Sequence, residues 1–115
     1  MPVRKYNDIE KTKVEMDGVV GTTKMVPIGK PEGWDDHTLR VFTIDPGGNT
    51  PKHSHDWEHV NYIMAGKGKL TIGDKTHEVE KGDFALVPPN EMHQFENPYD
   101  EKFEFICIVP NREEY

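Results

Sequence analysis

Four histidines carry the chemistry that this sequence offers most clearly. Three of them, His53, His55 and His59, fall within a seven-residue stretch that follows a Pro-Gly-Gly turn. His53 and His55 are two residues apart, so an extended strand would point both rings to one side, whereas a helix would turn them well apart. His59 comes four residues later, where a short turn can present a third ring. His93, after a Pro-Pro-Asn turn, is a fourth candidate. This spacing is typical of metal ligands.

The lone cysteine limits the kind of metal site. Cys107 is the single cysteine among 115 residues, which excludes an internal disulfide and a zinc cluster built from several thiolates. Any metal ion must therefore be held by imidazole or carboxylate groups.

Short runs of β-type composition surround the histidines. In the alternating run 38–44, Arg40, Phe42 and Ile44 share one face, and we expect the turn residues 45–48 to end this strand. Residues 22–28 form a further candidate strand. No run keeps a helical period, and the connections leave no room for crossover helices, so the pattern predicts an antiparallel sandwich or barrel. The later runs, separated by clusters of Gly, Pro, Asn and Asp, are 60–65, 70–72, 76–79, 84–87, 92–96 and 102–109.

Length and charge favour one domain with a small-molecule partner. We expect a single domain at 1–115, in which residues 1–30 form an extended segment. A formal net charge of −7 without a Lys/Arg-rich run argues against a nucleic-acid partner. The N-terminus lacks the apolar core of a signal peptide, and no stretch approaches the ~20 apolar residues of a membrane span. We therefore expect a cytoplasmic protein without a membrane partner.

Two spaced motifs give the chain its resemblance to a known family. The first runs Gly, five residues, His-x-His, three or four residues, Glu, six residues and Gly. The second runs Gly, five residues, Pro-x-Gly, two residues, His, three residues and Asn. The chain resembles a small single-domain cupin, which implies an all-β, antiparallel double-stranded β-helix, or jelly-roll barrel. The matching residues are Gly47, His53, His55, His59 and Gly66 for the first motif, and Gly82, Pro88, His93 and Asn97 for the second.

Two positions depart from the family pattern. His59 stands where the first motif usually has glutamate, and Asn90 where the second usually has glycine. Asn adopts the left-handed conformation more readily than most residues, so the second change is mild. An alternative alignment places Glu58 as a carboxylate ligand after a shorter gap. We prefer His59, because the surrounding run is similar to that of the four-histidine cupins.

That subgroup holds manganese or iron, so the resemblance implies one divalent transition metal ion bound by His53, His55, His59 and His93. Four neutral imidazoles leave the charge of the ion uncompensated, which makes it a stronger Lewis acid and disfavours its oxidation. Zinc, nickel or copper could replace manganese or iron, because imidazole affinity follows the Irving–Williams order. An octahedral arrangement would keep two positions open for substrate or dioxygen.

The functional expectation is an analogy with that subgroup. The first interpretation is an oxidoreductase with oxygenase or dioxygenase chemistry on a small organic substrate, its ion shielded by apolar walls that include Phe105. The alternatives are a metal-dependent isomerase or lyase, and a non-enzymatic protein that binds a small molecule, because one fold serves all of these functions.

Few side chains outside the ligand set could transfer a proton, and the catalytic candidates are Cys107, Glu58 and Tyr62. Alternation along the last strand turns Cys107 inward with Phe103 and Phe105, and alternation from His59 turns Asn61 inward. We expect Glu58 to be a solvated turn residue. Arg40 could reach an anionic substrate or lie in a surface ion pair, and we favour the surface position. His37 and His77 lie outside both motifs, and we expect them to have structural roles.

A sheet edge left exposed by this fold would need protection. Small jelly-roll cupins commonly pair through such an edge, often with an N-terminal strand crossing to the partner. We therefore expect a homodimer, for which the weakly patterned residues 1–30 are the candidates for exchange.

Overall fold

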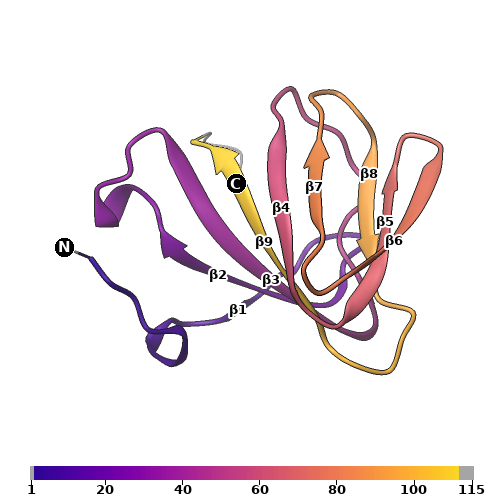
Figure 1. Ribbon diagram of the computed structural model, residues 1–115, viewed down its shortest axis with the longest axis horizontal. Coiled ribbons are helices and arrows are strands. Elements are labelled where there is room, and N and C mark those ends of the chain that lie inside the picture. The colour runs from indigo at the N-terminus through magenta and orange to yellow at the C-terminus, as the bar shows by residue number, and fades with distance from the viewer. Residues whose placement is uncertain (1, 112–115) are drawn as a thin grey trace.

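Within residues 2–111, which the computed structural model describes, nine strands form one strongly curled antiparallel sheet (Figure 1). The strand order is β6-β5-β8-β3-β9-β4-β7, and β2 pairs with both β1 and β3. The sheet folds back on itself as the predicted jelly-roll barrel. The elements are η1 (Tyr6–Asp8), β1 (Thr12–Lys13), β2 (Val20–Ile28), η2 (Lys30–Glu32), β3 (His37–Asn49), β4 (His59–Ala65), β5 (Lys67–Ile72), β6 (Lys75–Glu80), β7 (Phe84–Val87), β8 (His93–Glu96) and β9 (Phe103–Pro110).

The long strand β3 belongs to both halves of the barrel. Its first part pairs with β9, and its end pairs with β8 through Asn49 and Glu96. The prediction that residues 45–48 end this strand is wrong. They form a bulge. Thr22 of β2 pairs with Ile44 of β3, but Val20, two residues earlier on β2, pairs with Asn49, so the register shifts across residues 45–48. A bulge bends the strand that contains it, which lets one strand serve both halves of the barrel.

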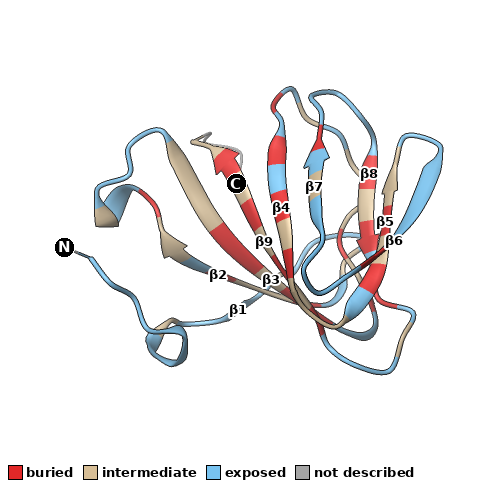
Figure 2. Ribbon diagram, in the orientation of Figure 1, coloured by how far each residue is buried: buried red, intermediate tan, exposed pale blue. Residues whose placement is uncertain are grey.

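Alternation along the strands builds the core. On β9, buried and half-buried residues alternate along the whole strand (Figure 2). Cys107 is buried together with Phe103 and Phe105, as predicted. Phe95 of β8 stacks on Phe105 with ring centroids 4.0 Å apart. Buried aromatic rings contribute large apolar areas. This cluster therefore fixes β8 and β9 against each other, and these strands carry His93 and Cys107.

Gly66 shows why the first motif ends in glycine. It joins β4 to β5 with a φ of 69°, in the left-handed region. A Cβ atom at this position would lie 2.1 Å from the carbonyl oxygen of Lys102, which no side chain can tolerate. Glycine is thus required at the end of the first motif both by the left-handed conformation and by the close packing of the backbone.

The N-terminal segment contacts the barrel at Glu104 of β9. Tyr6 donates a hydrogen bond to Glu104, and Lys11 lies 3.6 Å from the same carboxylate. The predicted strand at 22–28 is confirmed, although β2 begins earlier, at Val20, and it pairs with β3 of the same chain. Residues 2–30 therefore contact the barrel through both hydrogen bonds and strand pairing.

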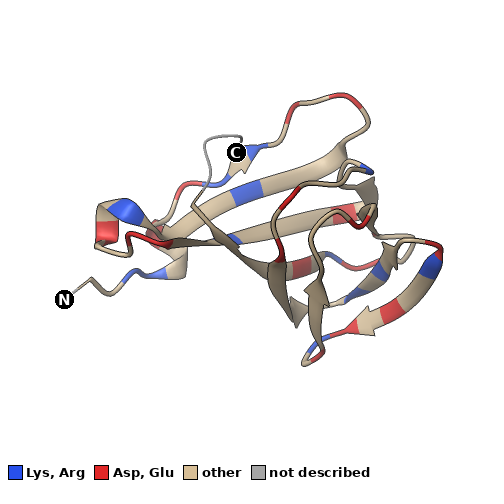
Figure 3. Ribbon diagram, turned by 90° about the horizontal axis from the view of Figure 1, so that it is seen from above, with Lys and Arg blue, Asp and Glu red and all other residues tan. Residues whose placement is uncertain are grey.

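The surface of the described region carries charges of both signs. Basic and acidic residues are interspersed over the loops and the hairpin of β5 and β6 (Figure 3). In the same region, no helix is long and apolar enough to cross a membrane.

Candidate metal centre

The four histidines come from two segments of the chain that the fold brings side by side. His53 and His55 lie between β3 and β4, whereas His59 begins β4 and His93 begins β8. His53 and His93 form an isolated antiparallel bridge, with backbone N···O distances of 3.1 and 2.9 Å. The backbone N–H of Asn90 donates to the backbone carbonyl oxygen of His55 at 2.7 Å. Backbone hydrogen bonds thus hold the two motifs together before any side chain is considered.

Asn90 allows this connection because it adopts the left-handed conformation. Its φ is 68°, and within residues 2–111 it is the one residue other than glycine with a positive φ. The sequence prediction that asparagine can replace the usual glycine here is borne out by this geometry. The tight turn after Pro88-Pro89 directs the chain back toward His55, and it sets the position at which His93 enters β8.

The imidazole rings converge on one point. The ring centroid of His93 lies 4.7 Å from that of His53, 4.9 Å from that of His55 and 4.8 Å from that of His59. The ligand atoms of His53, His55 and His93 all lie within 4.8 Å of one another. His59 joins them through its Nε2 atom, which is 3.2 Å from Nε2 of His93.

This separation fits two ligands of one ion. Metal–nitrogen bonds to histidine are about 2.0–2.1 Å long. Two such bonds at angles between about 90° and 109° place the nitrogen atoms roughly 2.8–3.4 Å apart. The 3.2 Å between Nε2 of His59 and Nε2 of His93 falls in this range. These two nitrogen atoms can therefore occupy neighbouring positions on one transition metal ion, a class of ion that imidazole binds well.

Hydrogen bonds fix the tautomer of three of the rings. Nδ1 of His55 lies 2.8 Å from the carbonyl oxygen of Trp57, and Nδ1 of His93 lies 3.0 Å from that of Glu91. Carbonyl oxygens only accept, so both Nδ1 atoms carry the proton. Nδ1 of His59 contacts Oδ1 of Asn61 at 2.8 Å. In each ring Nε2 keeps its lone pair, which is the arrangement that metal-binding histidines use.

Burial keeps the rings neutral. Burial, with the neighbouring His93 as a smaller cause, lowers the pKa of His53 to about 4 and that of His59 to about 3. The pKa values of His55 and His93 are lowered as well, mainly by burial. A neutral imidazole is the form that binds a metal. At neutral pH the cluster therefore needs to lose no proton before it accepts an ion.

Trp57 packs against one of the four imidazole rings. Its ring stacks on that of His55, with centroids 4.2 Å apart and planes tilted by 5°. The side chain is buried and belongs to the hydrophobic core. The tryptophan therefore positions His55 by packing.

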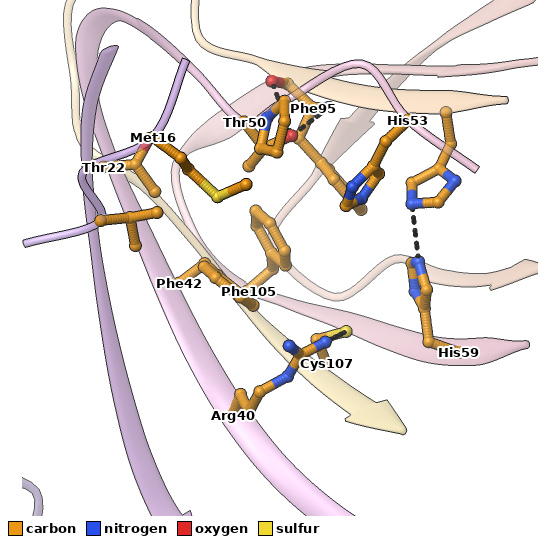
Figure 4. A pocket seen from close by; sticks show the side chains of 13 residues that line it. Met16, Thr22, Arg40, Phe42, Thr50, His53, His59, Phe95, Phe105 and Cys107 are labelled. Atoms are coloured by element: carbon orange, nitrogen blue, oxygen red, sulfur yellow. Dashed lines mark hydrogen bonds between the residues drawn. The ribbon is translucent and has the colours of Figure 1, made fainter. Parts of the chain in front are cut away.

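A cavity of about 50 Å³ opens beside the histidines (Figure 4). A water molecule needs about 10–15 Å³ by this measure, so the cavity has room for a small group. Rings from β3, β8 and β9 form much of its wall, and the N-terminal segment adds two side chains. The lining residues are Val14, Met16, Thr22, Arg40, Phe42, Thr50, Pro51, His53, His59, His93, Phe95, Phe105 and Cys107.

The three catalytic candidates lie in different places. Cys107 lines the cavity, and burial raises the pKa of its thiol. Glu58 is exposed, as expected of a turn residue, and it is not among the residues that line the cavity. Tyr62 packs on Phe84, with ring centroids 4.9 Å apart, and is likewise absent from the lining. The structure brings only Cys107 of the three to the cavity.

Arg40 corrects a prediction. We expected it at the surface, but it is buried with 4% of its area exposed, and it lines the cavity. Its Nη2 donates to Sγ of Cys107, its partner across β3 and β9, at 3.2 Å. The sequence signal was present, because Arg40 shares its strand face with Phe42 and Ile44. The contributions of Val14 and Met16 had no comparable signal.

Comparisons with known proteins show the family and the fold to which the chain is similar. A family model for the cupin domain matches residues 40–109. The crystal structure of the polyketide cyclase RemF from Streptomyces resistomycificus superposes with a TM-score of 0.92 at 30% sequence identity. The match covers 100% of this chain and 82% of that one.

Two curated relatives match over shorter segments. The 1-methylthio-D-xylulose 5-phosphate methylsulfurylase of Rhodospirillum rubrum is 34% identical over 71 residues, which cover 62% of this chain and 46% of the relative. An acireductone dioxygenase of Heterostelium pallidum is 37% identical over 49 residues, or 38% of this chain and 34% of the relative. The matched region is thus less than half of each curated relative.

Proposed function

Since the chain belongs to the cupin family, we propose that it binds one divalent transition metal ion per chain through His53, His55, His59 and His93. The observation that carries this proposal is the cluster of four imidazoles, in three of which Nδ1 is already hydrogen-bonded and leaves Nε2 to bind the ion. Glu58, the alternative carboxylate ligand, is exposed, whereas the neighbouring His59 is buried. Manganese and iron are the first candidates, and zinc, nickel and copper can compete for the same nitrogen atoms.

We infer that the bound ion acts as a Lewis acid on a carbonyl or hydroxyl oxygen of a small organic substrate. Four neutral ligands support this function, because they leave the charge of the ion uncompensated. The likeness to a polyketide cyclase over the whole chain supports it too, since polyketides are rich in carbonyl groups. This order differs from the one that the sequence suggested, in which oxygenase chemistry came first.

The chain's own residues would prepare the substrate. Phe42 and Phe105, stacked with centroids 5.6 Å apart, form an apolar wall that excludes water beside the histidines. A lower local polarity strengthens electrostatic interactions at the site. Cys107 keeps its proton on Sγ because burial raises its pKa, so the thiol can serve as a hydrogen-bond donor facing the cavity.

Oxygenase chemistry is the second candidate. It is favoured by the match to an acireductone dioxygenase, and it needs no general base among the cavity side chains. A protein that binds a small molecule without converting it is the third candidate.

One experiment separates these functions. Protein purified without a chelating resin is analysed for metal, then loaded separately with Zn²⁺, Mn²⁺ or Fe²⁺. Each form is given a panel of diketones, enols and diols under nitrogen and under air. Turnover by the zinc form under nitrogen supports Lewis-acid chemistry. Oxygen consumption by the iron or manganese form alone supports the oxygenase. Binding without turnover supports the third function.

The metal proposal has its own control. His53→Ala and His93→Ala should abolish stoichiometric metal binding, whereas His77→Ala, at an exposed position on β6, should leave it intact. Retention of one tightly bound ion by both cluster variants would contradict the proposed ligand set.

We further propose that two copies of this chain associate through β7. This strand ends the sheet beside β4, and its side chains Phe84 and Leu86 are 76% and 59% exposed. Val60 of β4, which pairs with Leu86, is 45% exposed. An exposed apolar edge is protected when a second copy covers it. The exchange of residues 1–30, the single domain at 1–115, the absence of a nucleic-acid partner and a cytoplasmic location stay predictions from the sequence.

A further inference from the structure

Arg40 places a permanent positive charge in the wall of the histidine cavity. It reaches the cavity from the middle of β3, and its guanidinium lies beside the thiol of Cys107 (Figure 4). Arginine is rarely as deeply buried as this, because taking a charge out of water costs free energy. The location of the charge, next to the space where a substrate would lie, suggests that it serves binding.

The structure ties this charge to the histidine cluster. Arg40 lines the same cavity as His53, His59 and His93. Lys24 adds a second cation nearby. It pairs across the sheet with Phe42, burial and the charge of Arg40 lower its pKa, and with Arg40 it lines an adjoining cavity of about 170 Å³.

The other walls near Arg40 are apolar. The guanidinium carbon lies 5.1 Å from the centre of the Phe42 ring, a cation–π distance that orients the arginine side chain. Phe105 stacks on Phe42 from the neighbouring strand. The cavity therefore combines a cation, an apolar wall and the histidine cluster.

We propose that this cavity binds a small organic carboxylate, whose anionic group contacts Arg40 while its apolar part packs against Phe42 and Phe105. The inference rests on the proposed function and names its substrate class. A guanidinium presents its N–H groups as a planar fork, which matches the two oxygens of a carboxylate. Arg40 would thus orient the substrate between its own charge and the ion on the histidines, and set the specificity for anions.

The test compares charged ligands with neutral ligands of the same shape. Benzoate and benzamide form one pair, and propanoate and propanamide form a smaller pair. Calorimetric titrations are made with metal-free and with zinc-loaded protein, for the natural chain and for Arg40→Gln, Arg40→Lys and Arg4→Gln. Arg4 is the matched control, since it is exposed and pairs with Glu32 through Nη1 at 2.7 Å.

The natural chain should bind at least one carboxylate about tenfold or more tightly than its amide, even without metal. Arg40→Gln should abolish this preference, Arg40→Lys should keep part of it, and Arg4→Gln should keep all of it. Circular dichroism establishes that each variant is folded. If Arg40→Gln does not fold, the inference is tested by the preference of the natural chain for carboxylates over amides and by the change of that preference in Arg40→Lys.

Two results would overturn the inference. One is equal affinity of the natural chain for acids and amides, and the other is an unchanged preference in a folded Arg40→Gln or Arg40→Lys variant. Metal titration separates this failure from failure of the proposed function. Folded Arg40→Gln should still bind one zinc ion, and a natural chain that binds no metal would contradict the metal proposal while the metal-free titrations still test Arg40.

Discussion

Asn61 and His59 form a hydrogen bond that decides which nitrogen of the imidazole faces the cluster. Asn61 is completely buried, and its Nδ2 donates to the carbonyl oxygen of Ile106 at 3.1 Å. Its Oδ1 is thereby directed to Nδ1 of His59, 2.8 Å away. The amide cannot be reversed without losing both contacts, so Nε2 of His59 is left to face His93. One side chain, two residues along β4, thus prepares a proposed metal ligand.

The first prediction concerns this contact. Asn61→Ala should lower the affinity for Zn²⁺ or Mn²⁺ by about 10–100-fold, because His59 would lose the partner that orients its ring. Competition titration with a metal-binding dye measures the change. Asn49→Ala removes another side-chain amide, whose Nδ2 donates to the backbone oxygens of Gly18 and Thr50. That control should keep its metal affinity, and equal losses in both variants would show that Asn61 acts only through stability.

The second prediction concerns the stability of the metal-free protein. The pKa of His59 is about 3 in the folded chain, and an unfolded histidine titrates near ~6.5. Between these values the unfolded chain binds a proton that the folded chain does not. Stability should therefore be complete above pH ~6.5 and should fall as the pH decreases toward 3. Bound metal should oppose the loss until protons displace it.

Thermal denaturation of chelator-treated protein between pH 7.5 and 4 tests whether stability falls as the pH decreases. Carboxyl groups titrate in the lower part of the same range, so a variant is needed to isolate the histidine. His59→Gln should lose less stability than the natural chain over this range, whereas His77→Gln, at an exposed position, should lose as much as the natural chain. Identical pH dependence of His59→Gln and the natural chain would contradict the assignment.

The sequence predicted the parts of the site that depend on local pattern. The spacing of His53, His55 and His59 and the alternation of β9 survive folding, because neighbouring residues on a strand keep their relation to its faces. Arg40 was misplaced because a charged residue is exposed by default, and its partner Cys107 comes from β9, 67 residues away. The bulge at 45–48 was missed because its turn-type residues give no sign that pairing resumes at Asn49.

The third prediction concerns the turn that joins the two motifs. Asn90→Ala should destabilise the protein by about 1–2 kcal/mol, because an alanine side chain is strained in the left-handed conformation that Asn90 adopts at a φ of 68°. Asn90→Gly should cost little, since glycine adopts this conformation freely. Urea denaturation of the metal-free protein measures both. Equal stability of the alanine and glycine variants would show that this backbone conformation is not required.

The fourth prediction concerns the proposed contact between two copies at β7. Phe84→Glu should convert a dimer to a monomer, because it would bury a charge in the apolar patch that Phe84 forms with Leu86 and Val60. Light scattering coupled to size-exclusion chromatography measures the mass. Val3→Glu is the matched control, since Val3 is also 76% exposed but lies in the N-terminal segment. Loss of the dimer in the Val3 variant alone would favour association through residues 1–30, which is the exchange that the sequence suggested. A natural chain that is monomeric at all concentrations would exclude both arrangements.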